Sequence, residues 1–125
     1  AKLINRPINL SKDTTYKIEV IRHAVETIER ETKKKSSLVI SLQANSPEIQ
    51  SFDIDETIMH LIKYKLQEVI SVDENNNSNA AIRTMNRKAV FQKSLSTYLG
   101  CVYTDSSDIH TIKDIKKIYK KNENK

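Results

Sequence analysis

The chain has 125 residues, of which 38% are hydrophobic and 30% are charged, and its formal net charge at pH 7 is +5. This length suits one domain with its own core, and no apolar run approaches the roughly 20 residues that span a bilayer. Cys101 is the single cysteine, which excludes an internal disulfide and a pair of cysteine metal ligands. Because the N-terminus also lacks an apolar signal-peptide core, we expect a cytoplasmic protein with no membrane partner.

The first elements are a helix and a short strand. Apolar residues at helical spacing predict a one-sided helix from Lys17 to about Lys33, with Thr14 or Thr15 as its cap. Four of the five residues of Leu38–Leu42 are apolar, which is typical of a short buried strand.

A second helix and strand follow. Asp53 and Glu56, three residues apart, resemble a capping box and predict a helix that begins there. The segment "EVISV", Glu68–Val72, predicts a second strand, and "DENNNSN", Asp73–Asn79, predicts a polar loop. The next segment, "AAIRTM", is interpreted as a third strand.

The last elements complete an alternating pattern. "AVFQ" is ambiguous, "LGCVYT" at Leu99–Thr104 predicts a strand, and Thr111 with Asp114 predicts the start of a final amphipathic helix. Helices that alternate with strands indicate a single α/β domain, a three-layer α/β/α sandwich with a mainly parallel sheet.

The loop after the first strand is the clearest candidate for a site. Ligands of open α/β sheets bind beyond the carboxyl ends of strands, where Gln43, Asn45 and Ser46 would lie. A carboxamide both donates and accepts hydrogen bonds, which suits a base edge or a sugar hydroxyl. Pro47 keeps Ser46 away from helical angles. Two interpretations stay open, an ordinary turn and a ligand-binding loop.

Lysines gather in two places. Lys33, Lys34 and Lys35 form one run, and others crowd the C-terminus. They could contact nucleic-acid phosphates, or they could be solvated side chains near helix ends, where the helix dipole favours cations. Scarce aromatic residues and the lack of an RNA-binding signature favour the solvated interpretation, so we do not expect nucleic acid as a partner.

Three segments, in order, resemble the cytidylyltransferases that activate keto-sugar acids, the CMP-sialic acid and CMP-KDO synthetases. "LVISLQANSPEI" resembles the family's LQ-x-x-SP loop, and "RPINLSKDTTYKIEVIRHAVE" resembles its RP-x-x-L-x-x-D segment with the following helix. "SSDIHTIKDIKKI" is similar to its IDIDT-x-x-D strand end and closing helix. The resemblance spans Arg6 to Ile118, nearly the whole chain.

The resemblance implies a nucleotide-diphospho-sugar transferase-like fold and a nucleotidyl transfer. The anomeric hydroxyl of a keto-sugar acid would attack the α-phosphate of CTP, pyrophosphate would leave, and Mg²⁺ would stabilise the developing charge. Carried over by position, Gln43 would contact the sugar or the nucleotide, and Asn45 and Ser46 would complete this substrate-binding loop. Arg6 would face a phosphate or the carboxylate of the sugar.

The family's catalytic motif falls on Asp108 and His110. By resemblance, Asp108 would be the metal-binding carboxylate, whereas His110 stands where the family has a second carboxylate. Two residues apart on a strand, both would face the same way, yet Mg²⁺ rarely binds imidazole. For His110 three roles stay open: binding through water, accepting a proton, and a structural or surface position.

The family begins with a strand and a glycine-containing loop, roughly IPAR-x-x-S-K, that cradles the triphosphate. Nothing before Arg6 resembles this loop, and Gly100 is the single glycine. The chain therefore corresponds to the C-terminal two-thirds of a cytidylyltransferase-like domain, without its first strand and phosphate loop. It is a fragment, an incomplete sequence or a relic that no longer catalyses, and we expect catalysis only if an N-terminal segment is present. Open strand edges would make the isolated piece poorly stable.

The family also uses an arm before its C-terminal motif to form a homodimer. The corresponding region, about Asn75 to Gly100, is short and carries basic residues among apolar ones. It is interpreted either as a dimer contact or as an ordinary strand and helix. Two other functions remain as alternatives to the enzyme: a non-catalytic nucleotidyltransferase-like binding module and a basic nucleic-acid-binding α/β domain.

Overall fold

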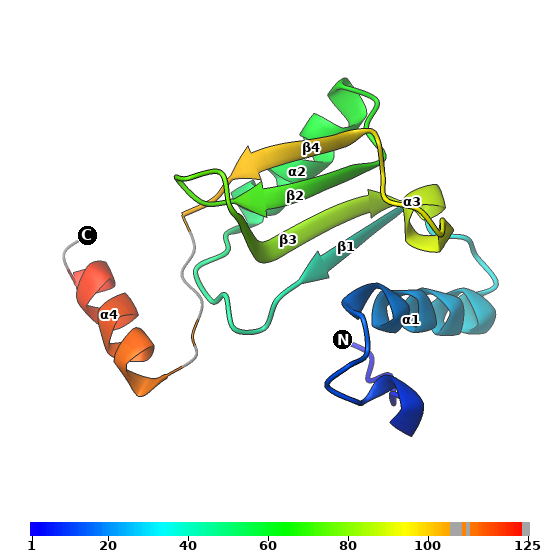
Figure 1. Cartoon of the computed structure of the whole chain (residues 1–125), viewed down its shortest axis with the longest axis horizontal. Coiled ribbons are helices and arrows are strands. Elements are labelled where there is room, and N and C mark those ends of the chain that lie inside the picture. The colour runs from blue at the N-terminus through cyan, green and yellow to red at the C-terminus, as the bar shows by residue number, and fades with distance from the viewer. Residues whose placement is uncertain (106–108, 110, 124–125) are drawn as a thin grey trace.

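A computed structural model describes residues 1–105, 109 and 111–123 of the chain. It has the predicted α/β class, with a four-stranded mixed sheet that has helices on both of its faces (Figure 1). The elements in chain order are η1 (Ile8–Leu10), α1 (Lys17–Thr32), β1 (Leu38–Leu42), α2 (Ser51–Lys63), β2 (Glu68–Val72), β3 (Ser78–Asn86), α3 (Arg87–Phe91), β4 (Leu99–Tyr103) and α4 (Ile112–Glu123).

The sheet order is β1-β3-β2-β4, and this sheet is mixed where a mainly parallel one was expected. The pairs β1 with β3 and β2 with β3 are antiparallel, and only β2 with β4 is parallel. The difference arises between β2 and β3, where the polar loop reverses the chain. Because β3 runs against both of its neighbours, β1, β2 and β4 share one direction, and their carboxyl ends lie at the same edge of the sheet.

The reversal is a compact turn built on Asp73. The backbone N–H of Asp73 donates to the carbonyl of Asn77 at 2.9 Å. The Asp73 carboxylate accepts from the backbone N–H groups of Asn75 and Asn77 at 2.8 and 3.0 Å. Asn76 adopts a positive φ of 62°, a conformation that asparagine tolerates better than most residues. β3 then begins at Ser78, so it takes in the end of the predicted loop as well as "AAIRTM".

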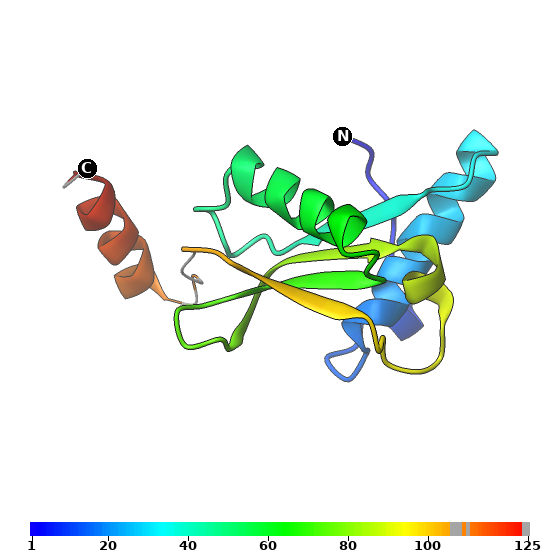
Figure 2. The same ribbon diagram turned by 90° about the horizontal axis from the view of Figure 1, so that it is seen from above.

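The two faces of the sheet are covered by different helices, as the view from above shows (Figure 2). On one face, α2 packs on β2 and β4 through Leu61, Val69 and Val102. Gly100 permits this approach, because a Cβ there would overlap Leu66 and lie 3.0 Å from the His60 ring. On the other face, α1 and α3 form a second cluster with β1 and β3, which contains Ile18, Ile21, Val25, Val39, Met85, Ala89, Val90 and Phe91.

N-terminal caps were predicted for α1, α2 and α4, and only that of α4 agrees with the structure. Thr111 and Asp114 form the predicted reciprocal bonds before α4. For α1 the threonine caps were wrong: the N-cap is Tyr16, without a side-chain bond, and the Thr15 hydroxyl donates to the Asn9 carbonyl instead.

The capping box of α2 lies one turn earlier than predicted. Gln50 is the N-cap, and its amide donates to the Asp53 carboxylate at 2.9 Å, so Asp53 is the N3 residue of the box rather than its cap. The ambiguous "AVFQ" segment contributes to the short helix α3, which is capped by Asn86, and "LGCVYT" forms β4.

None of the helices in the described part of the chain combines the length and apolar character needed to cross a lipid bilayer.

Candidate functional site

Polar residues follow all three strands that run in the same direction, at the edge where their carboxyl ends meet. Gln43, Asn45 and Ser46 come after β1, Asp73 follows β2, and Asp105 lies two residues beyond β4. This is the edge at which open α/β sheets bind ligands. The predicted loop therefore stands where a ligand-binding loop would be placed.

The loop after β1 is held by backbone bonds, and its two carboxamides form no hydrogen bond with the residues that the structure describes. The Gln43 amide N–H donates to the Ala81 carbonyl of β3, and the Ser46 N–H donates back to the Gln43 carbonyl, each at 3.1 Å. Ser46 is buried, whereas Gln43 and Asn45 are half-buried. The Gln43 side chain makes no hydrogen bond within the described residues, so both its donor and its acceptor are available to a ligand.

Asn45 carries the strongest signal for a ligand. Its Oδ1 atom is buried and accepts no hydrogen bond from any residue that the structure describes. Such an atom costs about 1–3 kcal/mol when it is left unpaired, and unpaired groups of this kind are few in native proteins. Its backbone carbonyl accepts from the Ile109 amide at 2.8 Å, which ties the loop to the segment after β4.

A lysine from α4 bridges two carboxylates at this edge. Lys121 Nζ lies 2.9 Å from Asp105 Oδ1 and 3.2 Å from Glu48 Oε2. The hydrogen bond that Lys121 donates to Asp105 is the main cause that raises the pKa of Lys121, with Glu48 adding to it and burial opposing it. Lys121 therefore stays protonated and joins α4 to the β1–α2 loop and to the end of β4.

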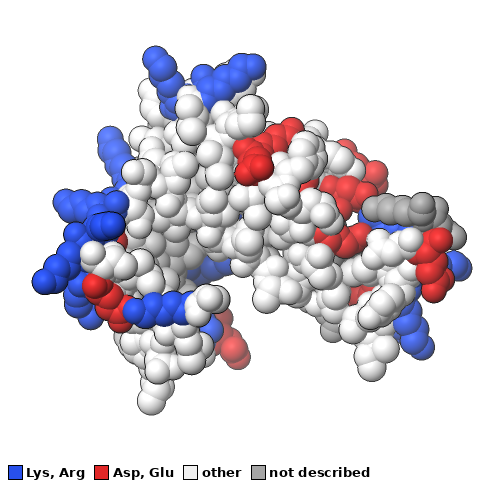
Figure 3. All heavy atoms as spheres, turned by 180° about the vertical axis from the view of Figure 1, so that it is seen from behind, with Lys and Arg blue, Asp and Glu red and all other residues white. Residues whose placement is uncertain are grey.

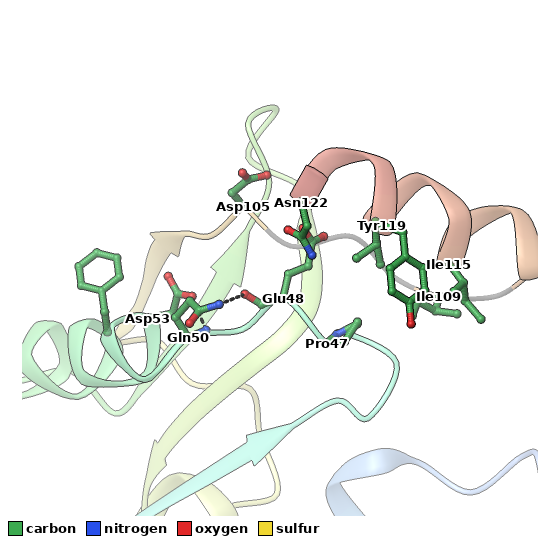
Figure 4. A pocket seen from close by; sticks show the side chains of 11 residues that line it. Pro47, Glu48, Gln50, Asp53, Asp105, Ile109, Ile115, Tyr119 and Asn122 are labelled. Carbon is green, nitrogen blue, oxygen red and sulfur yellow. Dashed lines mark hydrogen bonds between the residues drawn. The ribbon is translucent and has the colours of Figure 1, made fainter. Parts of the chain in front are cut away.

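A cavity of about 480 Å³ lies between that loop and α4. Figure 4 shows Glu48 and Asp53 on one side of it, and Ile115 and Tyr119 of α4 on the other. Asp105 also lines it. The cavity thus combines carboxylates with an apolar wall, and its size is that of a small-molecule site.

Buried hydroxyl and amide groups support the edge from inside the sheet. Ser71 Oγ donates to Asn79 Oδ1 at 2.5 Å, and Asn79 Nδ2 donates to Thr104 Oγ1 at 2.9 Å. These bonds link β2, β3 and the residue after β4. They hold the carboxyl ends of β2 and β4 in register, so Asp105 leaves the sheet from a fixed position.

The described residues do not by themselves make the Mg²⁺ site that the resemblance implies. No three or more His, Cys, Asp or Glu among them are grouped so that they could hold a metal ion. Mg²⁺ prefers carboxylate oxygens and water, but Glu48 and Asp105 are both engaged by Lys121. The predicted metal ligand and catalytic residue Asp108, and the predicted catalytic residue His110, lie outside the described residues.

The structure brings three of the predicted residues together and leaves a fourth separate. Gln43, Asn45 and Ser46 share one loop at the carboxyl edge. Arg6 is exposed in the segment before η1, and it makes no hydrogen bond or ion pair with any described residue.

Sequence reasoning missed Glu48, Asp105 and Lys121. The strand-end rule that selected Gln43 would also have selected Asp105, which follows a predicted strand directly. No local pattern signals the bridge by Lys121, because its partners are 16 and 73 residues away. The C-terminal lysines were interpreted as solvated side chains near a helix end, and Lys121 is in addition paired with two carboxylates.

The sequence matches no protein-family model, and no curated protein matches it significantly.

Proposed function

We propose that the chain is part of a cytidylyltransferase that transfers CMP from CTP to a keto-sugar acid and releases pyrophosphate. One observation carries the proposal. In the "LQANSP" loop, which resembles that family's substrate loop, the Gln43 side chain bonds none of the described residues and the buried Asn45 Oδ1 accepts from none of them. Both lie at the edge of the sheet where a ligand would bind.

Each residue has a role that its position permits. The Gln43 carboxamide pairs with sugar hydroxyls or the cytosine edge, and Asn45 Oδ1 accepts from an O–H or N–H group of the ligand. Ser46, buried and bonded to Gln43, fixes the shape of the loop. Arg6, whose guanidinium pairs with none of the described residues, offers it to a carboxylate or phosphate.

The remaining parts of the proposal rest on the resemblance. Asp108 is the proposed Mg²⁺ ligand, and it forms the proposed catalytic pair with His110. The first strand and the phosphate loop would complete a three-layer sandwich and hold the triphosphate of CTP. A cytoplasmic homodimer is proposed on the same basis.

A second candidate, nucleic-acid binding, is favoured by a groove at the other end of the molecule. Arg30, Lys33, Lys34 and Lys35 line a hollow of about 520 Å³ beside the end of α1. Arg87 also lines it, but its charge is paired with Glu29. Binding there would weaken steeply as salt is added, whereas hydrogen bonds at the Gln43–Ser46 loop would be far less sensitive to salt.

The test is an NMR titration of the isotope-labelled chain with CMP, CTP, N-acetylneuraminate and KDO. We expect CMP or a sugar acid to shift the side-chain amide signals of Gln43 and Asn45. Gln43→Ala and Asn45→Ala should each weaken binding about tenfold. The matched control is Gln67→Ala, which removes an amide at the amino end of β2 and should leave binding unchanged.

Asn45→Ala also separates function from folding. It removes a buried carbonyl that has no partner among the described residues, so we expect the free energy of unfolding to be unchanged or slightly raised. The proposal fails if none of the four ligands shifts these signals, or if both variants bind as well as the parent chain. Binding without pyrophosphate release, measured on the protein with any preceding segment it has in its source, would establish the non-catalytic module instead.

A further inference from the structure

The outer face of α2 is an uncovered apolar stripe. Phe52 and Met59 lie seven residues apart, two helical turns, and are 67% and 69% exposed. The opposite face of the helix carries Thr57 and Leu61, which are buried against the sheet. The stripe therefore takes no part in the chain's own core, although its side chains are large and apolar.

α4 carries a second stripe with the same spacing. Ile112 and Tyr119 are also seven residues apart and are 73% and 69% exposed, and Ile115 lies between them. No residue of this helix is buried. In Figures 1 and 2, α4 stands away from the sheet.

The two stripes carry opposite charges at the same position. Phe52, Glu56 and Met59 occupy positions i, i+4 and i+7 of α2, and Ile112, Lys116 and Tyr119 occupy the same positions of α4. Glu56 and Lys116 are both exposed. When two such helices pack side by side in the same direction, apolar residues meet at both ends, with Met59 facing Tyr119, and opposite charges meet near the middle. Figure 3 shows the α2 side of the molecule, where acidic groups gather towards α4.

The chain's own α4 does not cover the α2 stripe. Lys121 ties it to Glu48 and Asp105, and the 480 Å³ cavity separates its apolar side from the start of α2. With α4 held there, the α2 that meets its stripe comes from another molecule. A two-fold axis would let each α4 meet the other chain's α2, so one contact would form twice.

We propose that the Phe52–Met59 face of α2 is a docking site for α4 of a second copy of this chain. The resulting dimer is joined by two equivalent α2–α4 contacts. This surface is distinct from the Asn75–Gly100 segment in which a dimer contact was expected from the sequence. The proposal does not depend on the cytidylyltransferase activity, since it uses none of the Gln43–Ser46 loop, although Phe52 and Tyr119 also line the 480 Å³ cavity.

Sedimentation of the chain over a range of concentrations gives the first test. We expect a reversible dimer of about twice 14.4 kDa. Glu56→Lys and Lys116→Glu should each weaken association about tenfold, and the two together should restore it, because the charges are exchanged. The matched controls are Glu74→Lys and Lys34→Glu, exposed charges on other elements, which should leave the dimer intact. Circular dichroism shows whether each variant is folded.

A crosslink gives the second test and identifies the two faces. In a Cys101→Ser background, one chain carries Met59→Cys and another carries Tyr119→Cys, and the two are mixed under mild oxidation. We expect a disulfide between the two different chains, which can form only between molecules. A chain that stays monomeric at every concentration would overturn the proposal. So would a dimer that tolerates both single charge reversals, or a mixture without the mixed disulfide.

Discussion

The hydroxyl oxygens of Thr57 on α2 and Thr84 on β3 lie 2.8 Å apart, and both side chains are fully buried. Thr57 Oγ1 is also 2.7 Å from the Ile54 carbonyl of its own helix. The Thr57 hydroxyl donates to this carbonyl, so its oxygen accepts from the Thr84 hydroxyl. This bond joins α2 to β3 in the buried interface between them, and it helps to fix where α2 lies on the sheet.

The Thr57–Thr84 bond predicts a strong coupling between the two positions. Thr57→Val leaves the Thr84 hydroxyl buried without a partner and should lower the free energy of unfolding by about 1–3 kcal/mol. Adding Thr84→Val removes this unpaired hydroxyl, so the double variant should be at least as stable as Thr57→Val alone. Chemical denaturation of the two single variants and the double variant measures this coupling. Strictly additive losses would contradict it.

The pair Glu29 and Arg87 predicts a dependence of stability on acid. Arg87 Nε lies 2.9 Å from Glu29 Oε1, and this bond is the main cause that lowers the pKa of Glu29 below its usual 4.5. Stability from a lowered carboxyl pKa is complete above the unfolded value and is lost as pH falls through the folded one. We therefore expect Glu29→Gln to destabilise the chain near neutral pH and to make little difference in strong acid.

Denaturation curves recorded from neutral pH down through pH 4.5 would check this expectation. The matched control is Glu26→Gln, which removes a carboxylate from the exposed side of the same helix. A difference between Glu29→Gln and the parent chain that stays constant with pH would show that the charge of Glu29 is not the cause.

Lys121 predicts how firmly α4 is held. Replacing it with methionine removes its bonds to Glu48 and Asp105, while most of the apolar stem is kept. We expect faster amide hydrogen exchange in α4 and little change in the sheet. Lys117→Met, an exposed position on the same helix, is the control. Because the pKa of Lys121 is raised above its usual 10.5, the tie should persist from neutral pH up to that value and be lost on the alkaline side only above it. Equal exchange in the two variants would show that the bridge does not hold α4.

The strands and longer helices could be predicted from local patterns, whereas the direction of the third strand was missed. Apolar residues placed β1, β2 and β4 correctly because each is short and bounded by polar residues. The antiparallel course of β3 depends on the turn after β2. That turn was interpreted only as a loop, although its run of asparagines after Asp73 is typical of a tight reversal. A strand–turn–strand interpretation would have given the mixed sheet.

The candidate site was predictable where it depends on chain order and not where it depends on distant contacts. Gln43, Asn45 and Ser46 follow a strand, so their place at the carboxyl edge follows from the strand itself. Burial of Asn45 Oδ1 depends on the tertiary packing of the loop, and the bridge by Lys121 depends on the position of α4. Neither has a signature in the local sequence.

The turn at Asp73 also bears on how the chain reaches its fold. β2 and β3 are neighbours in sequence as well as in the sheet, so their pairing closes only a short loop and loses little chain entropy. Addition of β1 and of β4 each closes a much longer loop. The central hairpin is therefore the natural place for folding to begin, with the two outer strands added to a preformed template. The residues that were predicted only as a polar loop, Asp73–Asn79, would then control the rate of folding.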